Sequence, residues 1–128
     1  MDFKPNIPIY LQLIEYIELQ IISGNLSAGE KLMSVRDLAL KYGVNPNTMQ
    51  KALGELEHRQ LVYTVRTTGR YVTEDSSLIQ QIRKEAAERK LQQMMEELRQ
   101  MGYSSEEIKD LVENYLKEVD RDDSAGTI

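Results

Sequence analysis

Asn-Pro-Asn-Thr-Met-Gln-Lys-Ala-Leu-Gly-Glu-Leu, residues 45–56, is the stretch that decides the fold. Asn45 is a favoured N-cap residue and Pro46 fits the first helical position, so the sequence predicts that a helix begins here. Its apolar residues follow the i, i+3, i+4, i+7 spacing of a buried stripe: Met49, Ala52, Leu53 and Leu56. Its opposite face carries amides, a hydroxyl and one lysine: Asn47, Thr48, Gln50 and Lys51. Amides and hydroxyls can bond base edges and a lysine can bind phosphate or guanine, which makes this face a candidate nucleic-acid-binding surface.

A second, shorter helix is expected immediately before this one, over residues 34–42. Ser34 is its cap residue, Asp37 stands in the capping-box position, and Leu38 and Ala39 face inward. Gly43 then supplies a C-cap and a tight turn. A solvated surface helix would also have a polar face, but a helix, a glycine turn and a second helix form the helix-turn-helix motif. In that motif the second helix enters the major groove and the first crosses the DNA backbone.

The net charge of −5 is unevenly distributed along the 128 residues. Residues 1–75 carry 8 Lys/Arg and 9 Asp/Glu, whereas residues 76–128 carry 8 and 12. A near-neutral first part can still bind DNA through cations gathered on one face, because counterion release depends on local contacts.

Composition also argues against several classes of protein. The chain has no cysteine, so a disulfide or a thiolate metal site cannot form. It has no apolar run near the roughly 18 residues of a membrane span and no signal-peptide pattern, so we expect a soluble, cytoplasmic protein without a membrane partner. Its one histidine, His58, stands apart from any nucleophile, metal-ligand cluster or phosphate-binding glycine loop. We therefore expect no enzyme activity, no cofactor and no metal.

The remaining segments of residues 1–75 complete a mainly α domain with a small β-hairpin wing (α+β). A first helix over residues 8–22 has a wide apolar stripe, with Gln12, Glu15 and Glu18 expected outside. Residues 31–33 are expected to form a short edge strand. The β-rich segments 61–65 and 70–73 are joined by a glycine-containing loop, which predicts a hairpin. Three helices followed by a hairpin form a winged helix-turn-helix DNA-binding domain.

This domain carries the candidate contacts to double-stranded DNA. On the wing, arginines can follow phosphates or enter a minor groove, although an ordinary surface hairpin would also carry solvated arginines. On the helices, Arg36 lies in the first turn of the shorter helix, where it can bind an anion or form a surface ion pair with Asp37 or Glu30. The complete set is Ser34, Arg36, Asn45, Asn47, Thr48, Gln50, Lys51, Arg66, Thr68, Gly69 and Arg70.

Residues 76–119 are predicted to form a two-helix dimerisation region. Apolar residues alternate at spacings of 4 and 3 up to Met101, and Ser104 with Glu107 forms a capping box that begins a last helix. A lone helical hairpin has one apolar layer and nothing to cover it, so we expect a second copy of the chain to pack against it, giving a homodimer. The alternative is that the hairpin folds back on its own winged domain. The candidate interface residues are Leu91, Met94, Leu98, Met101, Ile108, Leu111, Val112 and Tyr115.

The segment 120–128 is acidic and contains Gly and Ser, so we expect a disordered tail.

The order of these motifs resembles the DNA-binding domain of GntR-type bacterial transcription regulators. The residues that carry the resemblance lie in four stretches: 8–12 (Pro-Ile-Tyr-Leu-Gln), 24–32 (Gly-Asn-Leu-Ser-Ala-Gly-Glu-Lys-Leu), 34–39 (Ser-Val-Arg-Asp-Leu-Ala) and 44–53. The short C-terminal region resembles the YtrA-type subfamily, which lacks a large effector domain. The resemblance implies a homodimeric regulator that binds a pseudo-palindromic operator and represses neighbouring transporter genes.

The same resemblance implies roles for single residues. Arg36 matches the family arginine that reaches a guanine or phosphate, and Gly69 matches the glycine at the wing tip. Base-reading positions fall on Asn47, Thr48 and Gln50. Two positions depart from the pattern. Met33 replaces a usual proline, and Pro46-Asn47 stands where many branches carry a base-reading arginine, so the DNA sequence preference of those branches does not transfer.

Two further hypotheses remain open from the sequence. Winged domains also bind proteins, so the chain could be a winged-helix protein–protein interaction module without specific DNA binding. A small-molecule effector of unknown identity could bind where the winged domain meets the hairpin, around Tyr71, Tyr103 or Tyr115, although such tyrosines are more often core or interface residues.

Overall fold

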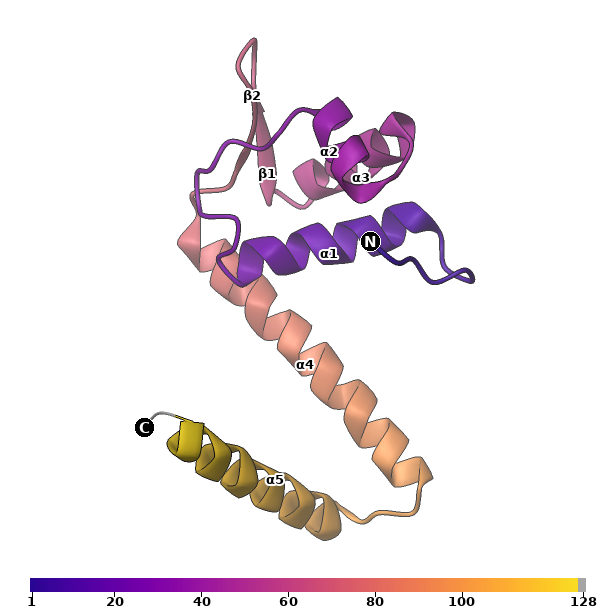
Figure 1. Cartoon of the computed structure of the whole chain (residues 1–128), viewed down its shortest axis with the longest axis vertical. Helices are drawn as coiled ribbons and strands as arrows, with labels where there is room; N and C mark the ends of the chain where they lie inside the picture. The colour runs from indigo at the N-terminus through magenta and orange to yellow at the C-terminus, as the bar shows by residue number, and fades with distance from the viewer. Residues whose placement is uncertain (127–128) are drawn as a thin grey trace. The chain divides into compact units, whose positions relative to one another are not determined.

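A computed structural model describes residues 1–126, and side chains as far as residue 122. The elements follow in the order α1 (Ile9–Ile22), α2 (Val35–Tyr42), α3 (Pro46–His58), β1 (Val62–Val65), β2 (Gly69–Val72), α4 (Ser76–Gln100) and α5 (Ser105–Gly126) (Figure 1). They divide into two compact units, Met1–Lys84 and Glu85–Ile128, and α4 begins in the first and ends in the second. The predicted fold class, a winged helix-turn-helix with a C-terminal helical region, is confirmed.

The helix-turn-helix is fixed by the caps that the sequence predicted. The Ser34 Oγ accepts a hydrogen bond from the Asp37 backbone N at 3.1 Å and begins α2. Gly43 ends α2 in the left-handed conformation, with φ of 68°. Asn45 Oδ1 accepts from the Asn47 backbone N at 2.8 Å and begins α3. Because these signals are local, the register of both helices could be predicted from the sequence alone.

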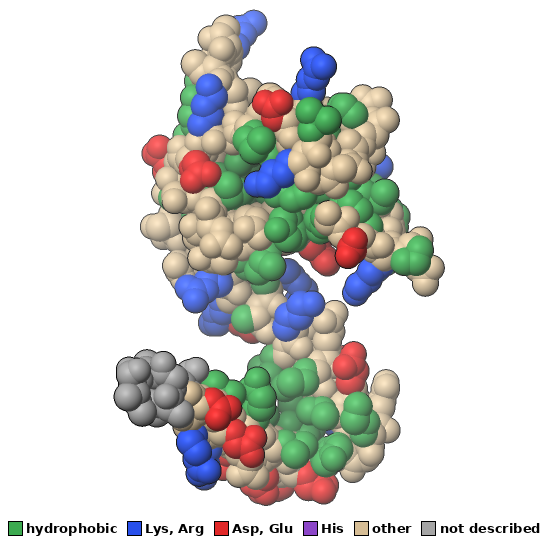
Figure 2. All heavy atoms as spheres, viewed as in Figure 1, with side chains coloured by type: hydrophobic (Ala, Val, Ile, Leu, Met, Phe, Trp, Pro, Cys, Tyr) green, Lys and Arg blue, Asp and Glu red, His purple; other side chains and the backbone are tan. Residues whose placement is uncertain are grey.

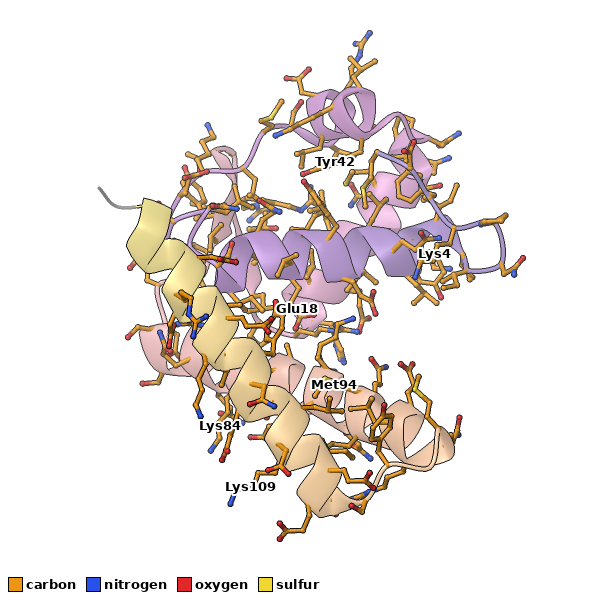
Figure 3. The ribbon with its side chains drawn as sticks, turned by 60° about the horizontal axis from the view of Figure 1, so that its bottom comes forward. Lys4, Glu18, Tyr42, Lys84, Met94 and Lys109 are labelled. Carbon is orange, nitrogen blue, oxygen red and sulfur yellow. The ribbon has the colours of Figure 1, made fainter. Side chains whose placement is uncertain are left out.

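The core of the first unit lies where α1 and α2 pack against α3. Tyr16 of α1 meets Tyr42 of α2 edge-on, with ring centroids 5.4 Å apart; Figure 3 shows Tyr42 between the two helices. The fully or nearly fully buried side chains include Leu13, Ile14, Ile21, Met49, Leu53 and Leu56. The expected stripes of α1 and α3 are therefore the surfaces that pack.

Glu18 departs from the expectation, because it is buried instead of facing solvent on α1 (Figure 3). One Arg59 Nη atom lies 3.9 Å from Glu18 Oε2, and Arg59 Nε also pairs with Glu55 at 3.2 Å. Arg59 is the C-cap of α3, so this ion pair joins the two helices that form most of the core. Helical periodicity within α1 could not reveal a partner supplied by another helix.

The wing is an antiparallel pair with the register Val62↔Val72 to Val65↔Gly69. The other edge of β2 pairs with the segment that the sequence predicted as a strand over residues 31–33. There the structure has a single bridge, Lys31↔Tyr71, supported by backbone hydrogen bonds such as Leu32 N to Arg70 O at 2.9 Å. β2 is thus held on one edge by β1 and on the other edge by the segment that contains Lys31.

In the second unit, the later part of α4 and α5 form the predicted helical hairpin. The capping box is reciprocal: the Ser104 backbone N donates to Glu107 Oε1 at 3.0 Å, and the Glu107 backbone N donates to Ser104 Oγ at 3.2 Å. The hydrogen bond from the Ser104 backbone N, and then the interaction with the Ser104 side chain, lower the pKa of Glu107 below its ordinary value. We expected residues 120–128 to form a disordered tail, but α5 extends to Gly126, so residues 120–126 are helical. Residues 127–128 lie outside the described part of the chain.

Two glycines of the helix-turn-helix give a matched stability prediction. A Cβ added to either Gly43 or Gly54 would meet nothing within 4 Å, so only the backbone conformation differs. Gly54 has an ordinary helical backbone, so we expect Gly54→Ala to raise the free energy of unfolding by about 1 kcal/mol. Gly43 has φ of +68°, so we expect Gly43→Ala to lower it by about 1–2 kcal/mol. Urea denaturation measures both, and shifts of the same sign would contradict the assignment.

Candidate nucleic-acid interface

The exposed face of α3 carries free hydrogen-bonding groups. Asn47 and Gln50 are exposed and Thr48 is half-buried, whereas Met49 between them is fully buried. Among the described residues, the side-chain amides of Asn47 and Gln50 have no hydrogen-bond partner. A free amide on a rigid, capped helix can bond a base edge without first breaking a contact within the protein.

Arg36 adds a cation at the start of α2. Its side chain is exposed and forms no ion pair within the described part of the chain. Of the two ion-pair partners considered from the sequence, Glu30 accepts a hydrogen bond from the Ser27 backbone N at 3.3 Å. The guanidinium is therefore available to bind a phosphate or the guanine edge in bidentate fashion.

Three predicted contacts have a structural role in the absence of DNA. The side-chain oxygens of Ser34 and Asn45 cap α2 and α3. The Lys51 ammonium lies 3.8 Å from the ring centroid of Tyr10 in α1, a cation–π contact that joins α3 to α1. Lys51 is exposed on α3, so it can also contribute positive potential to that face of the helix.

The outer end of the wing carries a second cation. Arg66 follows β1 in the turn, is exposed, and has no ion pair among the described residues. Thr68 closes the turn through its hydroxyl, which donates to the Val65 carbonyl at 3.2 Å. Gly69 has φ of +131°, and a Cβ there would lie 3.2 Å from Lys31 Cε, so both conformation and space favour glycine. Figure 2 shows Lys and Arg side chains protruding at this end of the hairpin.

Arg70, predicted as an equivalent wing cation, is placed differently from Arg66. Its side chain is 21% exposed, and its Nε donates to Glu57 Oε1 at 2.8 Å. Glu57 lies near the end of α3 and was not predicted as part of the site. No local pattern could have indicated it, since its partners come from the two strands of the wing.

The sequence comparisons agree with this geometry. The family model for bacterial regulatory proteins of the gntR family matches residues 9–72, from α1 to β2. The chain belongs to the GntR family. It is 32% identical to the HTH-type transcriptional repressor YtrA of Bacillus subtilis, over 98% of this chain and 95% of that protein. This similarity along nearly the whole length places the chain in the YtrA-type subfamily.

Solved structures of GntR-family proteins have the same architecture. A GntR family transcriptional regulator from Listeria monocytogenes is 41% identical, with a TM-score of 0.82 over 88% of this chain and 98% of that one. The DNA-binding domain of AraR, solved in complex with operator ORX1, is 28% identical, with a TM-score of 0.53 over 57% of this chain and 93% of that one. The chain is thus a DNA-binding transcriptional regulator of a family whose members are not enzymes.

The hairpin of this GntR-family chain exposes apolar side chains that the sequence assigned to a dimer interface. Six of the eight are exposed: Leu91, Met94, Met101, Leu111, Val112 and Tyr115. Leu98 is half-buried and Ile108 is only 3% exposed, so Ile108 is already covered by its own chain and is not free to contact a partner. Leu116, 53% exposed, was missed, although it lies one helical turn after Val112. Figure 2 shows hydrophobic side chains gathered on this unit.

The three tyrosines proposed for an effector do not belong to one unit. Tyr71 lies in the wing and stacks on Tyr63, with ring centroids 5.7 Å apart, whereas Tyr103 and Tyr115 belong to the hairpin. The first unit contains a hollow of about 210 Å³, lined by residues that include Tyr16 and Tyr42, that the sequence did not predict. An effector and its site stay a prediction.

Among the described helices, none combines the length and the apolar character that a membrane span requires.

Proposed function

We propose that this GntR-family regulator acts in the cytoplasm as a homodimer on a pseudo-palindromic operator and represses adjacent genes, transporter genes among them. The observation that carries the proposal is the pair of side-chain amides of Asn47 and Gln50 on the capped helix α3, which have no hydrogen-bond partner among the described residues. Arg36 and Arg66 add exposed cations from α2 and the wing of the same unit. In a homodimer, the winged units of the two chains, related by a two-fold axis, can reach successive major grooves about 34–36 Å apart.

The names of relatives support the repressor role. YtrA of Bacillus subtilis, similar over almost the whole chain, is a transcriptional repressor by name. The AraR domain binds an operator in its solved complex, and it resembles the winged unit of this chain. The alternative, a protein-interaction module, has no comparable support, because free amides and unpaired arginines together suit base edges and phosphates.

The test is to select duplexes from a random-sequence pool with the full chain and then to titrate the selected duplex at several salt concentrations. We expect log K to fall linearly with log [salt], with a slope of about −0.9 for each phosphate bound. We also expect the selected duplex to bind about 10³-fold or more tightly than random DNA. Equal affinity for selected and random duplexes would refute a sequence-specific regulator, and salt-independent binding would favour the protein-interaction module.

A further inference from the structure

Glu57 is the residue through which the recognition helix meets both strands of the wing. Its Oε1 atom accepts a hydrogen bond from the Thr64 hydroxyl of β1 and another from Arg70 Nε of β2, the latter at 2.8 Å. Thr64 and Arg70 are paired directly in the sheet register. Directly paired residues of antiparallel strands project from the same face of the sheet. One carboxylate oxygen therefore links the helix to both strands.

Among the described residues, the side-chain hydrogen bonds between the wing and α3 are those that Glu57 accepts. Val62 and Val72 are buried at the base of the wing, whereas the rest of β1 is exposed. Backbone pairing fixes the other edge of β2 to residues 29–32, but that segment does not belong to α3. Because one oxygen of Glu57 accepts a hydrogen bond from a residue on each strand, this link can define the angle between the wing and α3.

The same link determines how Arg70 is presented. A guanidinium has five N–H donors, and among the described residues only the Nε donor of Arg70 is bonded, which leaves those on its Nη atoms free. The hydrogen bond from Thr64, and then the contacts with Arg70, hold the pKa of Glu57 below its ordinary value of 4.5. The carboxylate is therefore ionised at neutral pH, and the pair with Arg70 is maintained.

We propose that Glu57 is a positioning residue for DNA binding, which sets the angle of the wing relative to α3 and holds the Arg70 guanidinium for contact with a phosphate. This inference rests on the proposed operator-binding function. The Glu57 carboxylate repels phosphate, so it is not itself the phosphate contact. Its effect is exerted through Thr64 and Arg70.

Three variants separate positioning from charge. Glu57→Ala removes the link, whereas Glu57→Gln removes the same charge but keeps an oxygen that can accept both hydrogen bonds. Glu55→Ala is the matched control, since Glu55 lies on the same helix and pairs with Arg59 instead of the wing. Each variant has one negative charge fewer, so long-range attraction for DNA should rise in all three.

The probe is the duplex that the wild-type chain selects from random-sequence DNA. We expect Glu57→Ala to bind it about tenfold more weakly or worse, in spite of the lost negative charge. The plot of log K against log [salt] should flatten by about 1–2 units, as one or two phosphate contacts are lost. Glu57→Gln and Glu55→Ala should stay within about threefold of the wild type and keep its salt slope.

Several results would overturn the role of Glu57. Wild-type affinity and salt slope for Glu57→Ala would refute positioning while leaving the proposed function intact, and an equal loss in Glu55→Ala would show that the effect is not specific to the contacts of Glu57 with the wing. A wild-type chain that selects no sequence would refute the proposed function itself.

If urea denaturation shows that Glu57→Ala is unfolded, Thr64→Val decides instead, since it removes one hydrogen bond and retains strand propensity. Thr64→Val should flatten the slope by a smaller amount, and an unchanged slope would overturn the role.

Discussion

Arg36→Ala is expected to weaken binding to the selected operator by about 1–3 kcal/mol for each half-site, roughly 5- to 150-fold. The guanidinium is exposed in the first turn of α2 and has no ion pair among the described residues. Its removal therefore breaks no ion pair among the described residues, and the loss is expected in DNA binding. A mobility-shift or fluorescence-anisotropy titration at fixed salt measures the effect, and urea denaturation should show nearly unchanged stability.

Lys41→Ala is the control for Arg36→Ala, because it removes one positive charge from the other end of the same helix. Lys41 lies in the last turn of α2, with its ammonium 5.7 Å from the Tyr42 ring centroid. We expect Lys41→Ala to reduce affinity for selected and random duplexes alike, whereas Arg36→Ala should reduce the ratio between them. Arg36→Lys should recover little, since an ammonium cannot bind guanine or phosphate as a planar fork. An equal loss in both alanine variants would make Arg36 a general cation only.

The winged unit could be predicted closely because its signals are local. Asn45 with Pro46 and Ser34 with Gly43 mark helix ends through hydrogen bonds that span a few residues. Helical periodicity then identifies the faces that pack. The same periodicity predicted the polar face of α3, where Asn47 and Gln50 lie exposed, and similarity to the GntR family added a role for Arg36, which is also exposed.

The parts that the sequence did not reveal depend on contacts between distant segments. Glu18 is buried and forms an ion pair with Arg59, which comes from the end of α3. Arg70 is held by Glu57, a pairing that follows from the packing of the wing on α3 and not from spacing. Ile108 shares the apolar stripe of α5 with Leu111, and the stripe alone could not indicate which of them its own chain covers. Periodicity identifies an apolar face but not the element that covers it.

Leu111→Glu is expected to dissociate the proposed homodimer. Leu111 is 43% exposed in the single chain, within the apolar surface of the hairpin. Burying a fully exposed leucine contributes about 1.5–3 kcal/mol, and Leu111 has 43% of its surface left to bury. A two-fold interface contains the residue twice, so dimerisation should weaken by about 1–3 kcal/mol before the cost of burying two carboxylates is added. That change is roughly ten- to hundred-fold in the dimer dissociation constant, and the buried carboxylates increase it further.

Asn114→Glu is the control for Leu111→Glu, because it introduces the same charge on α5 outside the apolar stripe. Sedimentation equilibrium should give about twice 14.8 kDa for the wild type and Asn114→Glu, and close to 14.8 kDa for Leu111→Glu. Because a monomer binds only one half-site, Leu111→Glu should also lose most of its affinity for the full operator while retaining weak binding to a half-site. A wild-type chain that is monomeric at micromolar concentration would refute the homodimer. Its binding to a full operator would then require two monomers to meet on the DNA, and the occupancy of the operator would rise steeply with protein concentration.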